Sequence, residues 1–219
     1  MSSRLKNNEA FIRNIYAKGP FQGHAFICTA TQTPSWSHKL GDYSISDRPV
    51  KEWLPIMRDE YERDLALLDE VESDAVPYIR LGTGTHIYAH AFGSPIKLFE
   101  NDNPCALPFI TTPGEADRVE IPDIWSTPVL YRVFEMARAV EEEFGRDVYL
   151  GPPDLQSGFD TACLIWDKTA LYCSMMMDDE RDAVKRLSDK CAKLFSDFVA
   201  ALREEFPRMQ WCHCPHTWC

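Results

Sequence analysis

The stretch that decides the fold is residues 75–90, which read AVPYIRLGTGTHIYAH. Its first part, Ala75 to Leu81, is mostly apolar and predicts a buried strand. Gly82-Thr83-Gly84 then ends the strand, because glycine permits the tight turn that a strand end requires. His86 and His90 follow, and they share one face if that stretch is helical. The sequence therefore predicts a core strand with polar groups gathered just after its carboxyl end.

Apolar residues at helical spacing predict long helices on both sides of this strand. One runs from about Val50 to Val71, one follows Pro128 and ends at Gly145, and the longest spans Glu180 to Phe206. Thr112-Pro113-Gly114-Glu115 has the form of a capping box and predicts another helix start. The remaining expected elements are strands at Ala25–Cys28, Val148–Leu150 and Gln210–Cys214, a short helix at Phe159–Trp166 and a long loop at Thr31–Arg48.

Strands that alternate with helices indicate parallel β/α units and hence an α/β fold. About four strands are expected in 219 residues, whereas an eight-fold barrel typically needs about 250 residues or more. The last predicted strand also begins only a few residues before the end of the chain. We therefore expect a partial barrel, roughly the first half, in a truncated reading frame.

Composition narrows the classes of function. The formal net charge of -11 argues against a general nucleic-acid or anionic-membrane binder, which would carry a basic surface. No apolar run is long enough to span a membrane, and the polar first ten residues lack the apolar core of a signal peptide. We expect a soluble cytoplasmic protein in which Cys28, Cys163, Cys173 and Cys191 are reduced and mostly buried.

Two stretches resemble the uroporphyrinogen decarboxylase superfamily, which includes corrinoid-linked methyltransferases. The first is LGTGTHIYAHAFGSPI, residues 81–96, which resembles the family's Gly-Thr turn and the Ala-Phe-Gly-Ser-like segment after it. The second is LQSGFDTACLIWDKTALYCSMMMDDERDAVKRL, residues 155–187, which resembles a family turn, its short helix and the start of a long helix. A weaker likeness to the family's linker covers residues 108–123.

The resemblance implies a (β/α)8 TIM barrel whose active site lies at the carboxyl ends of the strands. Residues 1–219 would form a single incomplete barrel domain, with residues 1–49 as an N-terminal extension and loop and residues 50–219 as β/α units. The family's decarboxylases carry an aspartate after the early strand, but Leu81 to Thr85 contains no carboxylate, and Leu164 stands where they carry a tyrosine. The resemblance therefore favours methyl transfer between a methylated corrinoid and a thiol. A tetrapyrrole decarboxylase in porphyrin biosynthesis and a non-catalytic fragment remain alternatives.

Candidate site residues follow the predicted strands. His86, His90 and Asp160 are the candidate catalytic groups; the two histidines could instead pack in a pocket wall, and Asp160 could simply begin a helix. A zincin motif is excluded, because Ile87 stands where HExxH needs glutamate. The candidate substrate-binding residues are Gly82, Thr83, Gly84, Thr85, Asp154 and Gln156. The glycine-rich residues would offer N–H groups to an anion, or form a plain tight turn.

Thiolate and imidazole ligands that Zn²⁺ prefers are densest at the end of the chain. Cys212, His213 and Cys214 are therefore candidate zinc ligands, although their spacing is not that of a zinc finger. The resemblance implies a zinc ion that activates a thiol, a corrinoid as substrate and a corrinoid protein as partner. A half-barrel also leaves two open sheet edges, so we expect a homodimer or aggregation and no turnover by the chain alone.

Overall fold

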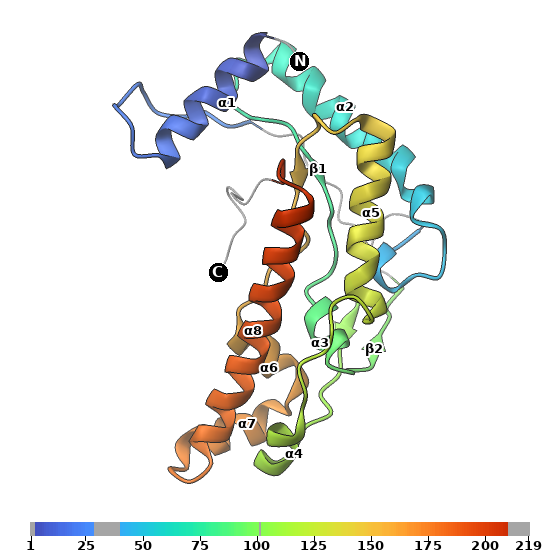
Figure 1. Ribbon diagram of the computed structural model, residues 1–219, viewed down its shortest axis with the longest axis vertical. Helices are drawn as coiled ribbons and strands as arrows, with labels where there is room; N and C mark the ends of the chain where they lie inside the picture. Colours follow the sequence, from blue (N-terminus) through green and yellow to red (C-terminus); the bar gives the residue numbers. More distant parts are fainter. Residues whose placement is uncertain (1–2, 29–39, 101, 210–219) are drawn as a thin grey trace.

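The computed structural model describes residues 3–28, 40–100 and 102–209 (Figure 1). The α-helices are α1 Ser3–Tyr16, α2 Leu54–Glu70, α3 Ile87–Ala91, α4 Pro113–Arg118, α5 Pro128–Phe144, α6 Gly158–Ile165, α7 Lys168–Met176 and α8 Arg181–Glu205. Two 3-10 turns, η2 Tyr43–Ile45 and η3 Val50–Trp53, precede α2. The strands are β1 Ile79–Arg80, β2 Ile96–Lys97, β3 Cys105–Ala106 and β4 Leu150–Gly151. The described chain is thus mixed α/β with a helical majority.

The sheet that positions the candidate site is small and parallel. In it β1 pairs with β4, Ile79 opposite Leu150 and Arg80 opposite Gly151. Met209 forms a parallel bridge to Leu150 on the other side of β4. A separate antiparallel pair, β2 with β3, forms a hairpin. The parallel pairing of the stretch before Gly82 with the stretch around Leu150 confirms that part of the sequence prediction.

The main core fills the space between this sheet, α5 and α8. Figure 1 shows α8 running along the molecule with α5 and the chain around β1 beside it. Phe134 of α5 and Phe198 of α8 meet edge to face with ring centroids 5.7 Å apart, and Tyr88 of α3 meets Phe198 at 5.9 Å. All three side chains are buried. Aromatic side chains bury large apolar areas, so these contacts bind three distant segments into one core.

The predicted helical stripes are confirmed by burial. The α8 stripe of Val184, Leu187, Cys191, Leu194, Phe198 and Leu202 is buried throughout. The helix after Pro128 ends at Gly145, whose φ of 86° is one that only glycine adopts readily. The capping box at the start of α4 is also present, because the Thr112 side chain accepts the Glu115 N–H and the Glu115 side chain reaches back.

Several sequence predictions differ from the structure. A partial TIM barrel is not confirmed, because the described strands are two residues long and form two two-stranded sheets, with isolated bridges such as that of Leu150 to Met209. Ala25–Cys28 is not a strand; instead, its backbone bonds to Ser73 and Asp74, as in the 2.7 Å bond from Asp74 N–H to the Phe26 carbonyl. The predicted strand Gln210–Cys214 lies outside the described residues.

Other differences concern elements that periodicity did not predict. Helix α1 attaches to the body mainly through polar bonds, since the buried Asn8 amide donates to the carbonyls of Ser73 and Ala75, each at 2.9 Å. Among the cysteines read as reduced and mostly buried, all are free, but Cys173 is exposed and only Cys191 is fully buried.

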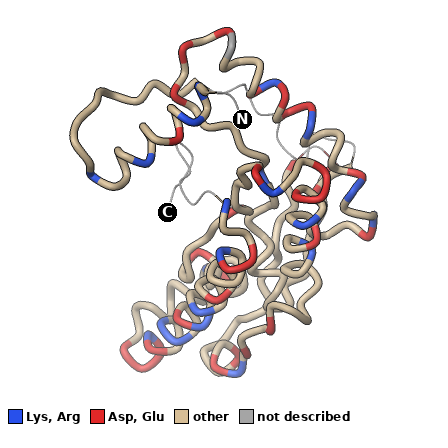
Figure 2. The backbone as a smooth tube through the Cα atoms, turned by 45° about the horizontal axis from the view of Figure 1, so that its top comes forward, with Lys and Arg blue, Asp and Glu red and all other residues tan. Residues whose placement is uncertain are grey.

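Charged side chains are spread along the outer faces of the helices. Figure 2 shows Lys and Arg interleaved with Asp and Glu along these helices. Several form pairs between neighbouring elements, such as Arg186 of α8 with Asp117 of α4 at 2.8 Å. Within the described ranges, no helix combines the length and apolar character needed to cross a membrane.

Candidate active site

The carboxyl ends of β1 and β4 lie side by side, because the two strands are parallel and in register. Backbone bonds from Ile79 N–H to the Tyr149 carbonyl, at 2.8 Å, and from Leu81 N–H to the Gly151 carbonyl, at 3.1 Å, extend the pairing. A Cβ on Gly151 would lie 2.4 Å from the Tyr78 ring. Glycine at 151 therefore lets the strands approach, and the segments after both strands emerge at one edge.

The two emerging segments are joined by polar contacts. The Thr83 hydroxyl accepts the Asp154 N–H at 3.3 Å. Arg80 and Asp154 form an ion pair, with Nη2 2.5 Å from Oδ1. The side chain of Arg80 is 36% exposed and that of Asp154 is 24% exposed, so this pair lies at the surface of the strand-end edge.

The carboxyl group of Asp154 is half-buried, and its pKa is shifted by its surroundings. Burial is the main cause that raises its pKa above the ordinary value, and the charge of Asp42 adds to the rise. Arg80 acts in the opposite direction through its charge and hydrogen bond. Asp154 therefore holds a proton more readily than a surface aspartate does, and its protonation depends on whether Arg80 stays beside it.

Asp42 connects a distant loop to this edge. Its Oδ2 accepts the Gly84 N–H at 2.6 Å, and its Oδ1 accepts the Ser44 N–H at 2.7 Å. The same Oδ2 lies 3.6 Å from Nε2 of His86, and the two side chains are 2% and 1% exposed. Beside it, the buried Tyr43 hydroxyl donates to the Leu81 carbonyl at 3.1 Å. Residues 42 and 43 thus clamp the turn that follows β1.

His86 is held in an unusual environment. Neither ring nitrogen has a hydrogen-bond partner among the residues that the structure describes. Burial lowers the pKa of His86; the charge of Asp42 opposes this effect and that of His90 adds to it. The ring is therefore neutral near pH 7. Because it is buried, His86 does not reach a substrate directly in this conformation.

The other predicted site residues occupy different settings. His90, in α3, pairs through Nδ1 with the Ser94 carbonyl at 2.9 Å. Asp160 is exposed in the first turn of α6, where its carboxylate accepts the Ser157 hydroxyl hydrogen at 2.8 Å. This is the helix-start role that the sequence left open, and a catalytic role for Asp160 stays a prediction. Gln156 is half-buried, and its Oε1 has no partner among the described residues.

The glycine-rich turn was expected to offer its N–H groups to an anion. The N–H of Gly84 is instead donated to Asp42, so that group is not open to a ligand. Gly82 is half-buried and Thr85 is exposed, and their predicted roles remain predictions. The helix that follows, α3, has five residues, which is too short to provide a substantial dipole.

The described residues do not fit a zinc site. Across residues 3–28, 40–100 and 102–209, no group of three or more His, Cys, Asp or Glu side chains is placed to hold a metal ion. The predicted ligands Cys212, His213 and Cys214 lie outside the described residues. Burial raises the pKa of Cys191 to about 12, so this thiol is not a ready source of thiolate.

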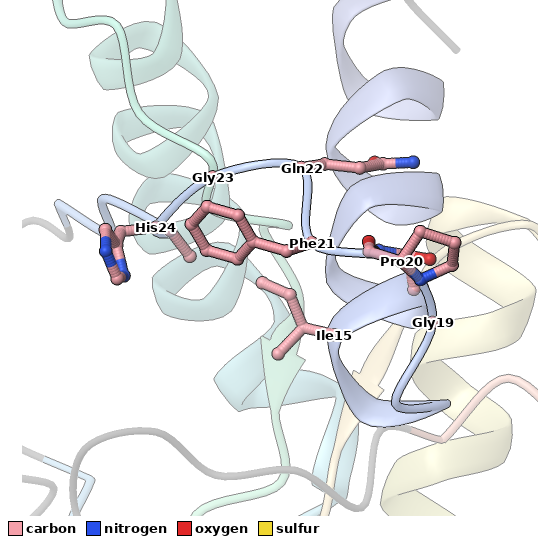
Figure 3. Close-up of a pocket in the computed structure, with 9 residues that line it drawn as sticks. Ile15, Gly19, Pro20, Phe21, Gln22, Gly23 and His24 are labelled. Carbon is pink, nitrogen blue, oxygen red and sulfur yellow. Dashed lines mark hydrogen bonds between the residues drawn. The ribbon is translucent and has the colours of Figure 1, made fainter.

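A hollow lies at the N-terminal end of the molecule (Figure 3). It has a volume of about 380 Å³ and is lined by α1 and the loop after it, including Ile15, Phe21 and His24. The Phe21 and His24 rings meet edge to face with centroids 5.3 Å apart. No residue predicted for the site lines this hollow, so it is separate from the polar cluster at the strand ends.

Comparison with known proteins agrees with this arrangement. The sequence model of the family described as uroporphyrinogen decarboxylase (URO-D) matches residues 62–206, more than half of the chain. The chain belongs to the uroporphyrinogen decarboxylase superfamily. The matched region contains both β1 and β4 and the segments after them. No curated protein matches the sequence.

A solved structure shows the same fold. It is described as a methyltransferase from Methanosarcina mazei and superposes with a TM-score of 0.58 at 14% sequence identity. The alignment covers 91% of this chain and 56% of that structure. The present chain therefore spans little more than half the length of that structure.

Sequence reasoning missed Asp42, Tyr43 and Arg80. Arg80 carries a signal that was available, because it directly precedes the predicted strand end. Asp42 bonds to a residue 42 positions away, and local patterns do not reveal such a contact. In addition, Asp42 lies in the segment Thr31 to Arg48, which the sequence predicted to be a loop without a site residue.

Proposed function

We propose that the chain acts in the methyltransferase branch of its superfamily and binds a methylated corrinoid, as substrate, at the carboxyl ends of β1 and β4. The observation that carries the proposal is the Arg80–Asp154 pair, at 2.5 Å. The two charges of this pair offset each other, so Arg80 is not an uncompensated cation at the strand ends. A tetrapyrrole decarboxylase must instead hold several substrate carboxylates, which requires uncompensated cations.

Two further facts support this branch over the decarboxylase. Leu81 to Thr85 contains no carboxylate to hold pyrrole nitrogens, and Asp42, which approaches the turn from another segment, is buried against Gly84 and Ser44. The formal net charge of -11 also repels a polyanionic substrate. The structural neighbour is described as a methyltransferase, and at 14% identity it supports the fold alone.

The proposed reaction moves a methyl group to a thiol. The thiol first gives its proton to a base, and the thiolate sulfur then attacks the methyl carbon. The C–S bond forms as the cobalt–carbon bond breaks, and the electron pair of the broken bond stays on the corrinoid. On this chain Asp154 is the group suited to accept the thiol proton, because its side chain is partly exposed and its pKa is raised by burial.

The proposal is tested with the full chain and two substrates in parallel. Methylcobalamin with a thiol is followed by its visible spectrum and by the amount of methyl thioether formed. Uroporphyrinogen is followed by the appearance of less carboxylated products. On this proposal methylcobalamin is bound and its methyl group reaches the thiol, with uroporphyrinogen unchanged. Methyl transfer would also overturn the sequence-based expectation of no turnover by the chain alone.

Two outcomes would contradict the proposal. Loss of carboxyl groups from uroporphyrinogen without methyl transfer would establish the decarboxylase alternative. Silence in both assays, from a chain whose circular dichroism shows an intact fold, would establish a fragment without activity of its own.

A further inference from the structure

The turn after β1 is held from outside its own strand. Three contacts fix it: Gly84 N–H to Asp42 at 2.6 Å, the Tyr43 hydroxyl to the Leu81 carbonyl at 3.1 Å, and Asp154 N–H to Thr83 at 3.3 Å. Two of these come from the segment around η2, which belongs to neither strand. The position of the candidate site is therefore set by a part of the chain that precedes the sheet.

Both oxygens of the Asp42 carboxylate take part in hydrogen bonds. Its two oxygens accept the backbone N–H groups of Ser44 and Gly84, and its side chain is 2% exposed. A buried carboxylate is costly unless hydrogen bonds compensate it. The third group beside it is the His86 ring, with Nε2 3.6 Å from Oδ2, which lies beyond the usual range of about 2.7–3.2 Å for a hydrogen bond.

Gly84 makes this close approach of the ring possible. A Cβ at position 84 would lie 2.4 Å from Nδ1 of His86 and 3.4 Å from Oδ2 of Asp42. Within the described part of the chain, both nitrogens of the buried ring lack a hydrogen-bond partner, an arrangement that is rare in native proteins and calls for an explanation. A shift of under about 1 Å closes the gap between Nε2 and Oδ2 to hydrogen-bond range.

We propose that Asp42 is a positioning residue for the strand-end site: it fixes the Gly82–Gly84 turn and orients His86 as the Nε2–H tautomer. In this tautomer Nδ1, beside Gly84, is the acceptor. The inference deepens the proposed function and rests on it where activity is concerned. The groups that face the pair are His90 on α3, Tyr43 on η2 and Asp154 after β4.

The test uses nuclear magnetic resonance on the full chain, without any substrate. The variant Asp42→Asn removes the charge and keeps the size of the side chain. Its control, Asp123→Asn, removes an exposed aspartate that also accepts a backbone N–H, that of Ser126 at 2.9 Å. Asparagine keeps one acceptor oxygen where the carboxylate has two, so Asp42→Asn is expected to speed exchange of the Gly84 or the Ser44 amide about tenfold or more. It is also expected to lower the pKa of His86 further. Asp123→Asn is expected to change neither.

A measurement on the unaltered chain keeps the inference testable if Asp42→Asn does not fold. Nitrogen-15 spectra of the His86 ring distinguish the two tautomers. The Nε2–H form is expected, and the Nδ1–H form would overturn the inference. Unchanged exchange of both the Gly84 and the Ser44 amides and an unchanged His86 titration in a folded Asp42→Asn would also overturn it.

Activity separates this inference from the proposed function. If the unaltered chain transfers methyl groups, Asp42→Asn is expected to lower the rate and shift its pH profile, whereas Asp123→Asn leaves both unchanged; equal rates and profiles would contradict the positioning role. If the unaltered chain has no activity but the resonance changes occur, the proposed function fails and the positioning role of Asp42 stands.

Discussion

At the residue scale, the site depends on a few close approaches that leave no room for a side chain. Gly84 is the clearest, since its missing Cβ leaves room for the His86 ring. Gly84→Ala is expected to lower the free energy of unfolding by about 1–3 kcal/mol, because a buried ring or the turn must move. Chemical denaturation measures this change.

Gly114→Ala is the matched control for that substitution. A Cβ there would meet only the end of the Arg118 side chain, at 3.7 Å, in the first turn of α4. Alanine is the better helix former, so we expect unchanged or slightly higher stability. A Gly84→Ala protein as stable as Gly114→Ala would show that the His86 ring is not packed against the turn.

His86 predicts a pH dependence of stability with a definite sign. Its pKa is lowered in the folded chain by burial, while an unfolded histidine titrates near about 6.5. As the pH falls below that value, the unfolded chain gains a proton that the folded chain resists, so stability is lost towards acid pH.

His86→Gln removes this contribution. Urea unfolding at pH 7.5 and at pH 5.5, set at about one unit above and below the ordinary histidine pKa, is expected to show a smaller loss of stability for His86→Gln than for the unaltered chain. A control, His24→Gln, removes an exposed histidine and is expected to keep the full loss. An equal loss in all three proteins would mean that His86 titrates as freely as a surface histidine.

At the element scale, the long helices could be predicted and the short elements could not. The stripes of α5 and α8 bury one face against the core, which makes their periodicity strong enough to read. Helix α1 is docked by Asn8 and Arg4 rather than by an apolar stripe, so the periodic signal was weak. Among the strands, β1 lies inside the predicted Ala75–Leu81 and β4 overlaps the predicted Val148–Leu150, whereas β2 and β3 were not predicted. Each strand pairs over only two residues, which leaves little periodic pattern in the sequence.

The packing of the buried face of α8 predicts which substitutions in this helix lower stability. Phe198 is fully buried and touches the rings of Phe134 and Tyr88. Phe198→Ala is expected to lower the free energy of unfolding by about 3–5 kcal/mol, through lost transfer energy and a cavity. Ser196→Ala, at an exposed position of the same helix, is expected to change it by less than about 0.5 kcal/mol. Similar effects for the two would contradict the packing of α8.

At the scale of the whole molecule, the described residues form a polar cluster at the carboxyl ends of β1 and β4. The sequence predicted the family, the strand ends and four members of the cluster, which are Thr83, Gly84, His86 and Asp154. It could not predict that Asp42 joins them, because that contact depends on how the segment before α2 folds back over the turn. The hollow around Phe21 was not predicted either, because it forms between α1 and the loop that follows this helix.

Binding of the methylated corrinoid at the carboxyl ends of β1 and β4 can be followed residue by residue, in an amide-resolved titration of the full chain with methylcobalamin. We predict that the largest shifts fall on Arg80, the Gly82–Gly84 turn and residues 154–156. Shifts confined to the loop around Phe21 and His24, with the strand-end amides unchanged, would contradict the account.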